Sequence, residues 1–148
     1  MMEYRFGVIG VFINSNNLLL VGERSDIPSV WQFPQGGIEP GESATAAFYR
    51  EMSEELGTSN FSIIRHAHKQ TLYRFPSTLN APIAKKYLGQ SLQWFLARFN
   101  AQVTPALNNS DGEFMSISWR SVDEVLNGVV EWKKPAYEAG LRLLGFLR

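Results

Sequence analysis

The 148-residue chain contains no cysteine, which excludes disulfide bonds, thiol catalysis and cysteine-bound zinc or iron–sulfur centres. Fourteen basic residues balance fourteen acidic ones, so no overall field attracts the protein to duplex DNA or to an anionic membrane. The apolar runs are too short to cross a bilayer, and the N-terminal MMEYR does not resemble a signal peptide. We therefore expect a cytoplasmic protein without membrane partners, in which any anion-binding site is local.

Apolar residues make up 45 % of the sequence, enough for the core of one domain over residues 1–148. Runs rich in β-branched and aromatic residues predict strands at 6–13, 18–21, 31–33, 61–64, 70–75, 91–99 and 114–119. The NSNN turn after the first run predicts a hairpin with the second. Apolar spacing predicts helices at 44–56, 121–126 and 137–147. Strands mixed with helices indicate a layered α/β or α+β domain.

An acidic cluster near the end of the first predicted helix is the most informative feature. Ser43 is placed to cap the start of this helix and Gly57 to end it. Glu51, Glu54 and Glu55 are spaced so that their carboxylates project from one helix face, where each like-charge pair costs roughly 0.2–0.5 kcal/mol. Mg²⁺ prefers oxygen ligands and is often shared between carboxylates and substrate phosphates. We therefore expect a divalent cation at this cluster.

The residues around the cluster resemble the Nudix hydrolase signature. Gly36 is followed after five residues by Glu42 and, after seven more, by REMSEELG at 50–57. Thr58 departs from the family pattern, which usually has an aliphatic residue there, but the acidic positions are intact. The flanking words resemble bacterial RNA pyrophosphohydrolases and dinucleoside polyphosphate hydrolases: WQFPQGG at 31–37, YRFP at 73–76, GQSLQWF at 89–95 and EF at 113–114.

The resemblance implies a Nudix fold, in which a mixed sheet lies between helices and the signature holds divalent cations against a pyrophosphate. Carried over by position, the implied metal ligands are the signature glutamates and one glutamate outside the signature: Glu51, Glu54, Glu55 and Glu113. Arg50 resembles the arginine that holds a signature glutamate in place. A glycine loop beside a metal site also lets backbone carbonyls, that of Gln35 among them, reach a cation.

The chemistry of pyrophosphate hydrolysis fits such a site. Water attacks a polyanionic phosphorus poorly unless its pKa is lowered and the phosphate charge is neutralised. Mg²⁺ or Mn²⁺ held by clustered carboxylates supplies both effects, and we expect more than one ion when substrate is bound. Glu51, or alternatively Glu54, would act as the general base, and the spacing does not decide between them.

Candidate substrate contacts come from positions that match the RNA pyrophosphohydrolase branch. Arg5 and Arg24 match basic positions suited to phosphate, although each is equally readable as a surface arginine. Trp132 and Lys133 stand where the branch has an aromatic residue followed by lysine, which would stack a base and pair with a phosphate. Core packing explains the indole equally well. Tyr73 and Lys86 flank the expected cleft, Lys86 within the proline-containing segment 77–87 that we regard as a candidate lid.

The sequence thus predicts a metal-dependent pyrophosphohydrolase that acts on a nucleoside polyphosphate, with the triphosphorylated 5′ end of RNA as the preferred substrate. Two alternatives within the enzyme class are a dinucleoside tetraphosphate hydrolase and a house-cleaning hydrolase of free nucleotides. Outside it stands a catalytically silent domain used as a nucleotide sensor or protein-binding module. The intact glutamates at 51, 54 and 55 count against the silent domain.

Overall fold

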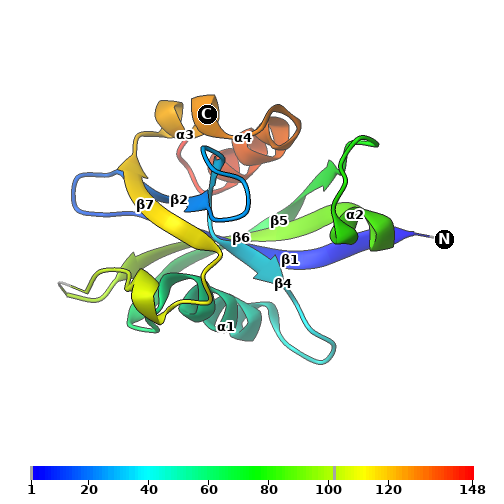
Figure 1. Cartoon of the computed structure of the whole chain (residues 1–148). Coiled ribbons are helices and arrows are strands. Elements are labelled where there is room, and N and C mark those ends of the chain that lie inside the picture. The colour runs from blue at the N-terminus through cyan, green and yellow to red at the C-terminus, as the bar shows by residue number, and fades with distance from the viewer. Residues whose placement is uncertain (1, 102) are drawn as a thin grey trace.

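The computed structural model describes residues 2–101 and 103–148 as two sheets with helices on both sides (Figure 1). The strands are β1 (Glu3–Phe12), β2 (Leu19–Arg24), β3 (Trp31–Gln32), β4 (Gln35–Gly37), β5 (Phe61–Arg74), β6 (Tyr87–Phe99) and β7 (Phe114–Arg120). The helices are α1 (Ala44–Leu56), α2 (Pro82–Lys86), α3 (Val122–Gly128) and α4 (Lys134–Leu143), with 3₁₀ turns η1 (Leu107–Asn109) and η2 (Glu131–Lys133). Strands mixed with helices in layers confirm the predicted fold class.

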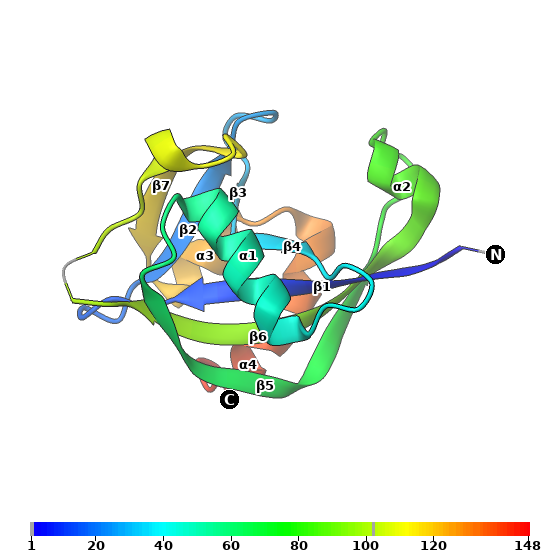
Figure 2. The ribbon, with the colours of Figure 1, turned by 90° about the horizontal axis from the view of Figure 1, so that it is seen from below.

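The larger sheet has the strand order β4-β1-β6-β5 and the smaller one β3-β2-β7. β1 runs parallel to β6 and antiparallel to β4, so the larger sheet is mixed. β6 lies between β1 and β5, as expected of the apolar run at 91–99. Helix α1 covers one face of this sheet, and α3 and α4 lie on the opposite side of the molecule (Figures 1 and 2). None of the helices formed by the described residues is long and apolar enough to span a membrane.

The predicted hairpin between the first two strands is wrong. β1 and β2 belong to different sheets and meet only at an isolated bridge between Ile13 and Leu19. The reason is that β6 and β4 occupy the two edges of β1, and Pro34 O accepts a further hydrogen bond from Gly10 N at 2.9 Å. With no free edge beside β1, the second strand pairs with β3 and β7 instead.

The separate strands predicted at 61–64 and 70–75 are also wrong, because they form one continuous strand, β5. The polar RHAHK segment between them does not end the strand, since β5 is an edge strand on which polar side chains remain exposed. The pairing with β6 slips at two points instead, between Ile63 and Arg65 and between His66 and Gln70. The expected lid at 77–87 contains helix α2, and α4 begins three residues earlier than predicted.

Helix α1 begins and ends where the sequence predicts. The Ser43 hydroxyl accepts a hydrogen bond from Ala46 N at 3.1 Å, and Gly57 adopts the left-handed conformation with φ 69°. The buried face of α1 packs Phe48 and Met52 against Phe12 and Phe95 of the sheet. The helix is therefore fixed in rotation, which places Glu55 on the buried face, Glu51 part-buried beside it and Glu54 exposed.

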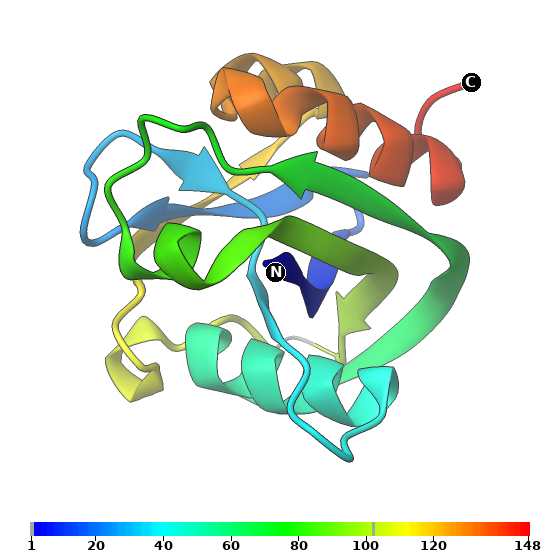
Figure 3. The same ribbon diagram turned by 90° about the vertical axis from the view of Figure 1, so that its right-hand side faces the viewer.

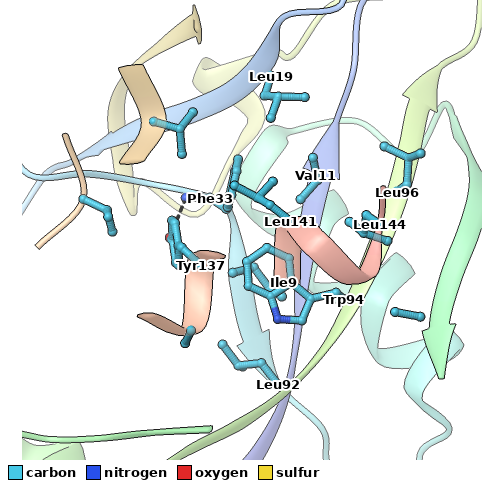
Figure 4. Close-up of a cluster of buried hydrophobic side chains, with 14 of the residues drawn as sticks. Ile9, Val11, Leu19, Phe33, Leu92, Trp94, Leu96, Tyr137, Leu141 and Leu144 are labelled. Atoms are coloured by element: carbon cyan, nitrogen blue, oxygen red, sulfur yellow. Dashed lines mark hydrogen bonds between the residues drawn. The ribbon is translucent and has the colours of Figure 1, made fainter. Parts of the chain in front are cut away.

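A second core lies between the larger sheet and α4, and Figure 4 shows its side chains. Tyr137 of α4 stacks on Phe33, and its hydroxyl accepts a hydrogen bond from Phe33 N at 3.0 Å. Trp94 donates its indole N–H to the Thr71 hydroxyl at 2.7 Å, so neither buried polar group is unpaired. These contacts hold the segment before the glycine loop in place, and that loop leads into α1.

Close packing of α4 on Trp94 predicts that Gly140→Ala is destabilising. A Cβ at this position would lie 1.9 Å from Trp94 Cε2, well inside van der Waals contact. Overpacking of this kind costs about 1–3 kcal/mol, more than the gain of up to about 1 kcal/mol in helix propensity. Urea unfolding measures the difference. Gly128→Ala is the control, because the only nearby atom is Arg120 Nη1 at 3.3 Å, and an equal loss in both variants would contradict the packing explanation.

Candidate active site

The C-terminal end of α1 is capped by a segment far away in the sequence. Ala106 N donates to Leu56 O and Asp111 N to Glu54 O, both at 2.8 Å, which satisfies carbonyls that a helix end leaves without partners. Ser25 holds the same segment from the other side, since its backbone N–H donates to Glu113 O at 2.9 Å. This capping brings Glu113 to the signature glutamates, where the resemblance expects it.

Arg50 joins the glycine loop to the glutamates. Its Nε and Nη2 donate to the two carboxylate oxygens of Glu42, each at 2.8 Å, and Nη2 also donates to Gly37 O at 2.8 Å. Nη1 donates to Glu51 Oε1 at 2.7 Å. The guanidinium fork holds the pKa of Glu42 down at about 2, so this carboxylate stays ionised. Arg50 therefore fixes the loop, Glu42 and Glu51 relative to one another.

Glycine is required at position 36 because the Glu51 side chain fills the space beside it. A Cβ on Gly36 would lie 2.0 Å from the Glu51 carboxyl carbon. The Glu51 side chain is only 14 % exposed. Burial raises its pKa despite the hydrogen bond from Arg50, and the Glu54 and Glu113 charges raise it further. Glu51 is thus a carboxylate that binds a proton or a cation more readily than a solvated one.

Glu55 is the most constrained member of the cluster. It is 1 % exposed, and its carboxylate oxygens accept no hydrogen bond, although the Glu113 carboxyl is close enough to form one when either group carries a proton. Burial raises its pKa well above the ordinary value, and the neighbouring Glu113 carboxyl raises it further. Glu54, by contrast, has a half-exposed side chain with Oε1 3.8 Å from Arg50 Nη1. The helix end therefore presents one buried and one solvated carboxylate beside Glu51.

The groups present fit a hard divalent cation. Glu55 Oε1 and Oε2 and Gln35 Oε1 are buried oxygen atoms without hydrogen-bond partners, and carboxylate and amide oxygens are ligands of Mg²⁺ and related ions. Within residues 2–101 and 103–148, no three acidic or histidine side chains are gathered as they are around an ion. Glu51 accepts a hydrogen bond from Arg50, so a cation would have to compete with the guanidinium for this carboxylate.

Tyr73 is at the centre of the neighbouring polar network. Its hydroxyl accepts hydrogen bonds from Gln35 Nε2 at 3.1 Å and from Gln90 Nε2 at 2.8 Å, and burial raises its pKa to about 12. Gln90, which the sequence reasoning did not single out, is 4 % exposed and leaves its Oε1 without a partner. The sequence signal that could have identified Gln90 is a glutamine within an otherwise apolar strand. Arg5 lies over Gly37, where a Cβ would be 2.4 Å from its Nη2.

Lys133 is buried beside this network. It is 5 % exposed, donates to Gln32 Oε1 at 3.2 Å, and lies 5.3 Å from the Trp132 ring and 5.6 Å from the Tyr73 ring. Burial, with help from the Arg24 charge, lowers its pKa to about 8. The indole of Trp132 is half-buried and packs edge-on to Tyr73. It therefore has one side in the core, as the packing interpretation expects.

The remaining predicted contacts are less closely tied to the cluster. Arg24 acts on the pKa of both Lys133 and Tyr73, but its guanidinium forms a two-bond pair with Asp26, at 2.8 and 2.5 Å. Lys86 is exposed at the end of α2, apart from these contacts. The structure thus gathers the glutamates, Arg50, Gln35, Arg5, Tyr73 and Lys133 around one region.

The buried Glu55 predicts a pH dependence of stability. Its folded-state pKa lies above the ordinary 4.5, so between the two pKa values the folded protein retains a proton that the unfolded chain loses. The free energy of unfolding therefore falls as pH rises from 4.5 to the folded-state pKa. Without divalent cations, Glu55→Gln should therefore be more stable than wild type at neutral pH, by about 1.4 kcal/mol for each unit by which burial raises the pKa of Glu55. The difference should vanish near the ordinary pKa. Urea unfolding in chelator across pH measures it, and a pH-independent difference would contradict the assignment.

Comparison with known proteins gives clear relatives. A family model described as the NUDIX domain matches residues 3–140. The chain is 38 % identical over 141 residues to the RNA pyrophosphohydrolase of Rickettsia conorii, covering 93 % of this chain and 88 % of the relative. It is 34 % identical over 151 residues to Nudix hydrolase 25 of Arabidopsis thaliana, covering 96 % and 86 %.

Solved structures share the fold at lower identity. The E. coli dihydroneopterin triphosphate pyrophosphohydrolase has a TM-score of 0.72 at 19 % identity, with 93 % of this chain and 96 % of that chain covered. A C. elegans Ap4A hydrolase has a TM-score of 0.65 at 17 % identity, with 97 % and 98 % covered. These likenesses confirm the fold expected from the signature. The family match and the relatives together show that the protein is an enzyme of the Nudix hydrolase family, in the branch that includes these RNA pyrophosphohydrolases.

Proposed function

We propose that the protein is a cytoplasmic, metal-dependent pyrophosphohydrolase that removes pyrophosphate from the triphosphorylated 5′ end of RNA. The observation that carries the proposal is the buried Glu55 carboxylate beside Glu51, with the buried Lys133 close enough for its charge to interact with that of Glu55. Carboxylates that bind divalent cations, with basic side chains nearby, suit a polyanionic phosphate chain. The relatives named RNA pyrophosphohydrolases, 38 % identical over most of the chain, support the choice of substrate.

The acidic face would hold Mg²⁺ or Mn²⁺ through Glu51, Glu54, Glu55 and Glu113, with an oxygen of Gln35 as a further ligand. When bound, the ions neutralise phosphate charge and lower the pKa of a water molecule. Arg50 has a positioning role, because its fork to Glu42 and its bond to Gly37 O set the place from which Glu51 acts.

The general base is Glu51 or Glu54. The raised pKa of Glu51 favours it, since a base works best when its pKa approaches the operating pH. The half-exposed Glu54 has easier access to water. Comparing the pH profiles of turnover for the two Glu→Gln variants distinguishes them, because only loss of the base removes the acidic limb of the profile.

The substrate would lie against the basic and aromatic side chains. Lys133 and Arg5 would contact phosphate oxygens, and Arg24 would exchange Asp26 for a phosphate of the same charge sign. Trp132 would stack a base on its half-buried ring, which Tyr73 and Phe75 support edge-on. Lys86, exposed on α2, would contact the chain of phosphates from the side of the proposed lid.

A dinucleoside tetraphosphate is the second candidate substrate. The balance of fourteen basic and fourteen acidic residues favours it, because a neutral protein has no general attraction for a long RNA. A panel distinguishes the candidates: triphosphorylated RNA, diadenosine tetraphosphate and free nucleoside triphosphates, each with Mg²⁺ or Mn²⁺. We expect the highest kcat/KM for RNA. A higher value for the dinucleotide would replace the first candidate, and no turnover of any substrate would favour the silent domain.

Glu54→Gln should lower turnover by orders of magnitude while the fold survives, because the side chain is half-exposed and its loss removes a carboxylate from the proposed metal site. Turnover at saturating Mg²⁺ and far-UV circular dichroism measure the two effects. Glu138→Gln, a glutamate of α4, is the matched control and should keep wild-type turnover. Near-normal turnover of Glu54→Gln at saturating metal would show that the metal-site assignment is wrong.

A further inference from the structure

A groove between β5 and α4 is separate from the glutamate cluster. It has a volume of about 530 Å³, and its lining includes Lys69, Thr71, Leu72, Pro135, Ala139 and Arg142. A second hollow of about 300 Å³ adjoins it along β5, sharing Lys69 and Leu143 with it and adding Arg65. Figure 3 shows α4 running beside β5 over this length. Together the two hollows form one track, which we call the β5–α4 groove.

The groove carries cations without aspartate or glutamate partners. Arg65, Lys69 and Arg142 are exposed, and no aspartate or glutamate is among the lining residues. In the described part of the chain, these three side chains form no ion pair with an aspartate or glutamate side chain. Arg65 Nη1 donates to Leu144 O and Arg142 Nε to Arg148 O, each at 2.8 Å, which orients both guanidinium groups and leaves further donors free. In a protein of zero net charge, this local excess suits an anionic chain.

One end of the groove adjoins the proposed substrate side. Leu72 directly precedes Tyr73 in β5, and Pro135 follows Lys133 by two residues at the start of α4. From there the groove runs back along β5 toward Arg65. A polymer whose 5′ end lies at Lys133 and Trp132 would therefore meet the cations of the groove in succession.

The shape of β5 favours a nucleic acid over a peptide as the occupant. β5 is an edge strand, which in principle accepts an added peptide strand. However, His66 pairs with Phe95 and Gln70 with Gln93, so β5 advances by four residues where β6 advances by two. The extra residues form a bulge in the edge strand in the middle of the groove. Bulges of this kind interrupt strand addition. Phosphate contacts need no continuous backbone ladder.

We propose that the β5–α4 groove binds the single-stranded RNA that follows the 5′-terminal nucleotide, with Lys69 and Arg142 contacting its phosphates. This inference rests on the proposed function and extends it from the reacting end to the body of the RNA. From Arg65 to Leu72 the neighbouring β6 advances by only five residues, from Leu96 to Ser91, so this part of the groove is roughly 17 Å long, room for about three extended nucleotides. Leu72, 57 % exposed, offers apolar surface to a base.

Direct binding tests the groove independently of hydrolysis. The probe is a 5′-hydroxyl single-stranded RNA of about ten nucleotides, and fluorescence anisotropy follows binding over a range of salt concentrations. Lys69→Gln and Arg142→Gln should each weaken binding and make the slope of log K against log salt shallower by about 0.7, the value for one lost phosphate contact. Arg98→Gln, an exposed strand cation outside the lining, should leave both unchanged. Wild-type binding and slope in both groove variants would overturn the proposal.

The kinetics of hydrolysis provide a second test of the groove. With triphosphorylated RNA, Lys69→Gln combined with Arg142→Gln should raise KM by about tenfold and leave kcat unchanged, whereas KM for a free nucleoside triphosphate stays constant. Equal changes for both substrates would mean a structural role and would overturn the proposal. An acidic peptide that binds the groove while the RNA does not would assign it to a protein partner instead. Failure to hydrolyse RNA would refute the proposed function, whereas RNA binding at the groove would be unaffected.

Discussion

The site depends on the hydrogen bonds of one arginine. Arg50 binds Glu42 through two nitrogens, Gly37 through its carbonyl and Glu51 through one oxygen. The loop before α1 and the middle of α1 are thereby fixed relative to each other, although seven residues lie between Glu42 and Arg50. Gly36 has no side chain because the Glu51 carboxylate held in this way occupies the space. A lysine at position 50 would lack the planar fork that makes these contacts simultaneously.

The same geometry leaves Glu55 in an unfavourable position. A buried carboxylate without hydrogen bonds is stabilised either by a proton or by a cation, and its raised pKa reflects the first of these. Glu51 shares the tendency, because burial outweighs its bond to Arg50. These buried carboxylates thus lower the free energy of unfolding of the metal-free protein, and a divalent ion held by them would restore it. Lys133 is the opposite case. Burial lowers its pKa, so a bound anion would stabilise its charged form.

Local signals in the sequence were sufficient for helix α1 and its acidic face, because capping by Ser43, the stop at Gly57 and the apolar spacing act within the segment. The hairpin was mispredicted because the pairing of β2 depends on which strands already occupy the edges of β1. The sequence predicts two strands where β5 is continuous, because the middle of β5 is polar. Polar side chains are compatible with an edge strand, but whether a strand lies at an edge depends on distant parts of the chain. The proximity of Glu113 to Glu55 arises from backbone contacts between segment 106–113 and the end of α1, which only the family resemblance indicated.

Binding of Mn²⁺, followed by the electron paramagnetic resonance signal of the free ion, tests most directly whether the end of α1 is a cation site. We expect saturable binding to the wild-type protein without substrate and a loss of affinity of roughly tenfold or more in Glu55→Gln, because this buried carboxylate has no other partner. The Glu138→Gln control on α4 should bind as the wild type does. Wild-type affinity for Mn²⁺ in Glu55→Gln would contradict the metal site.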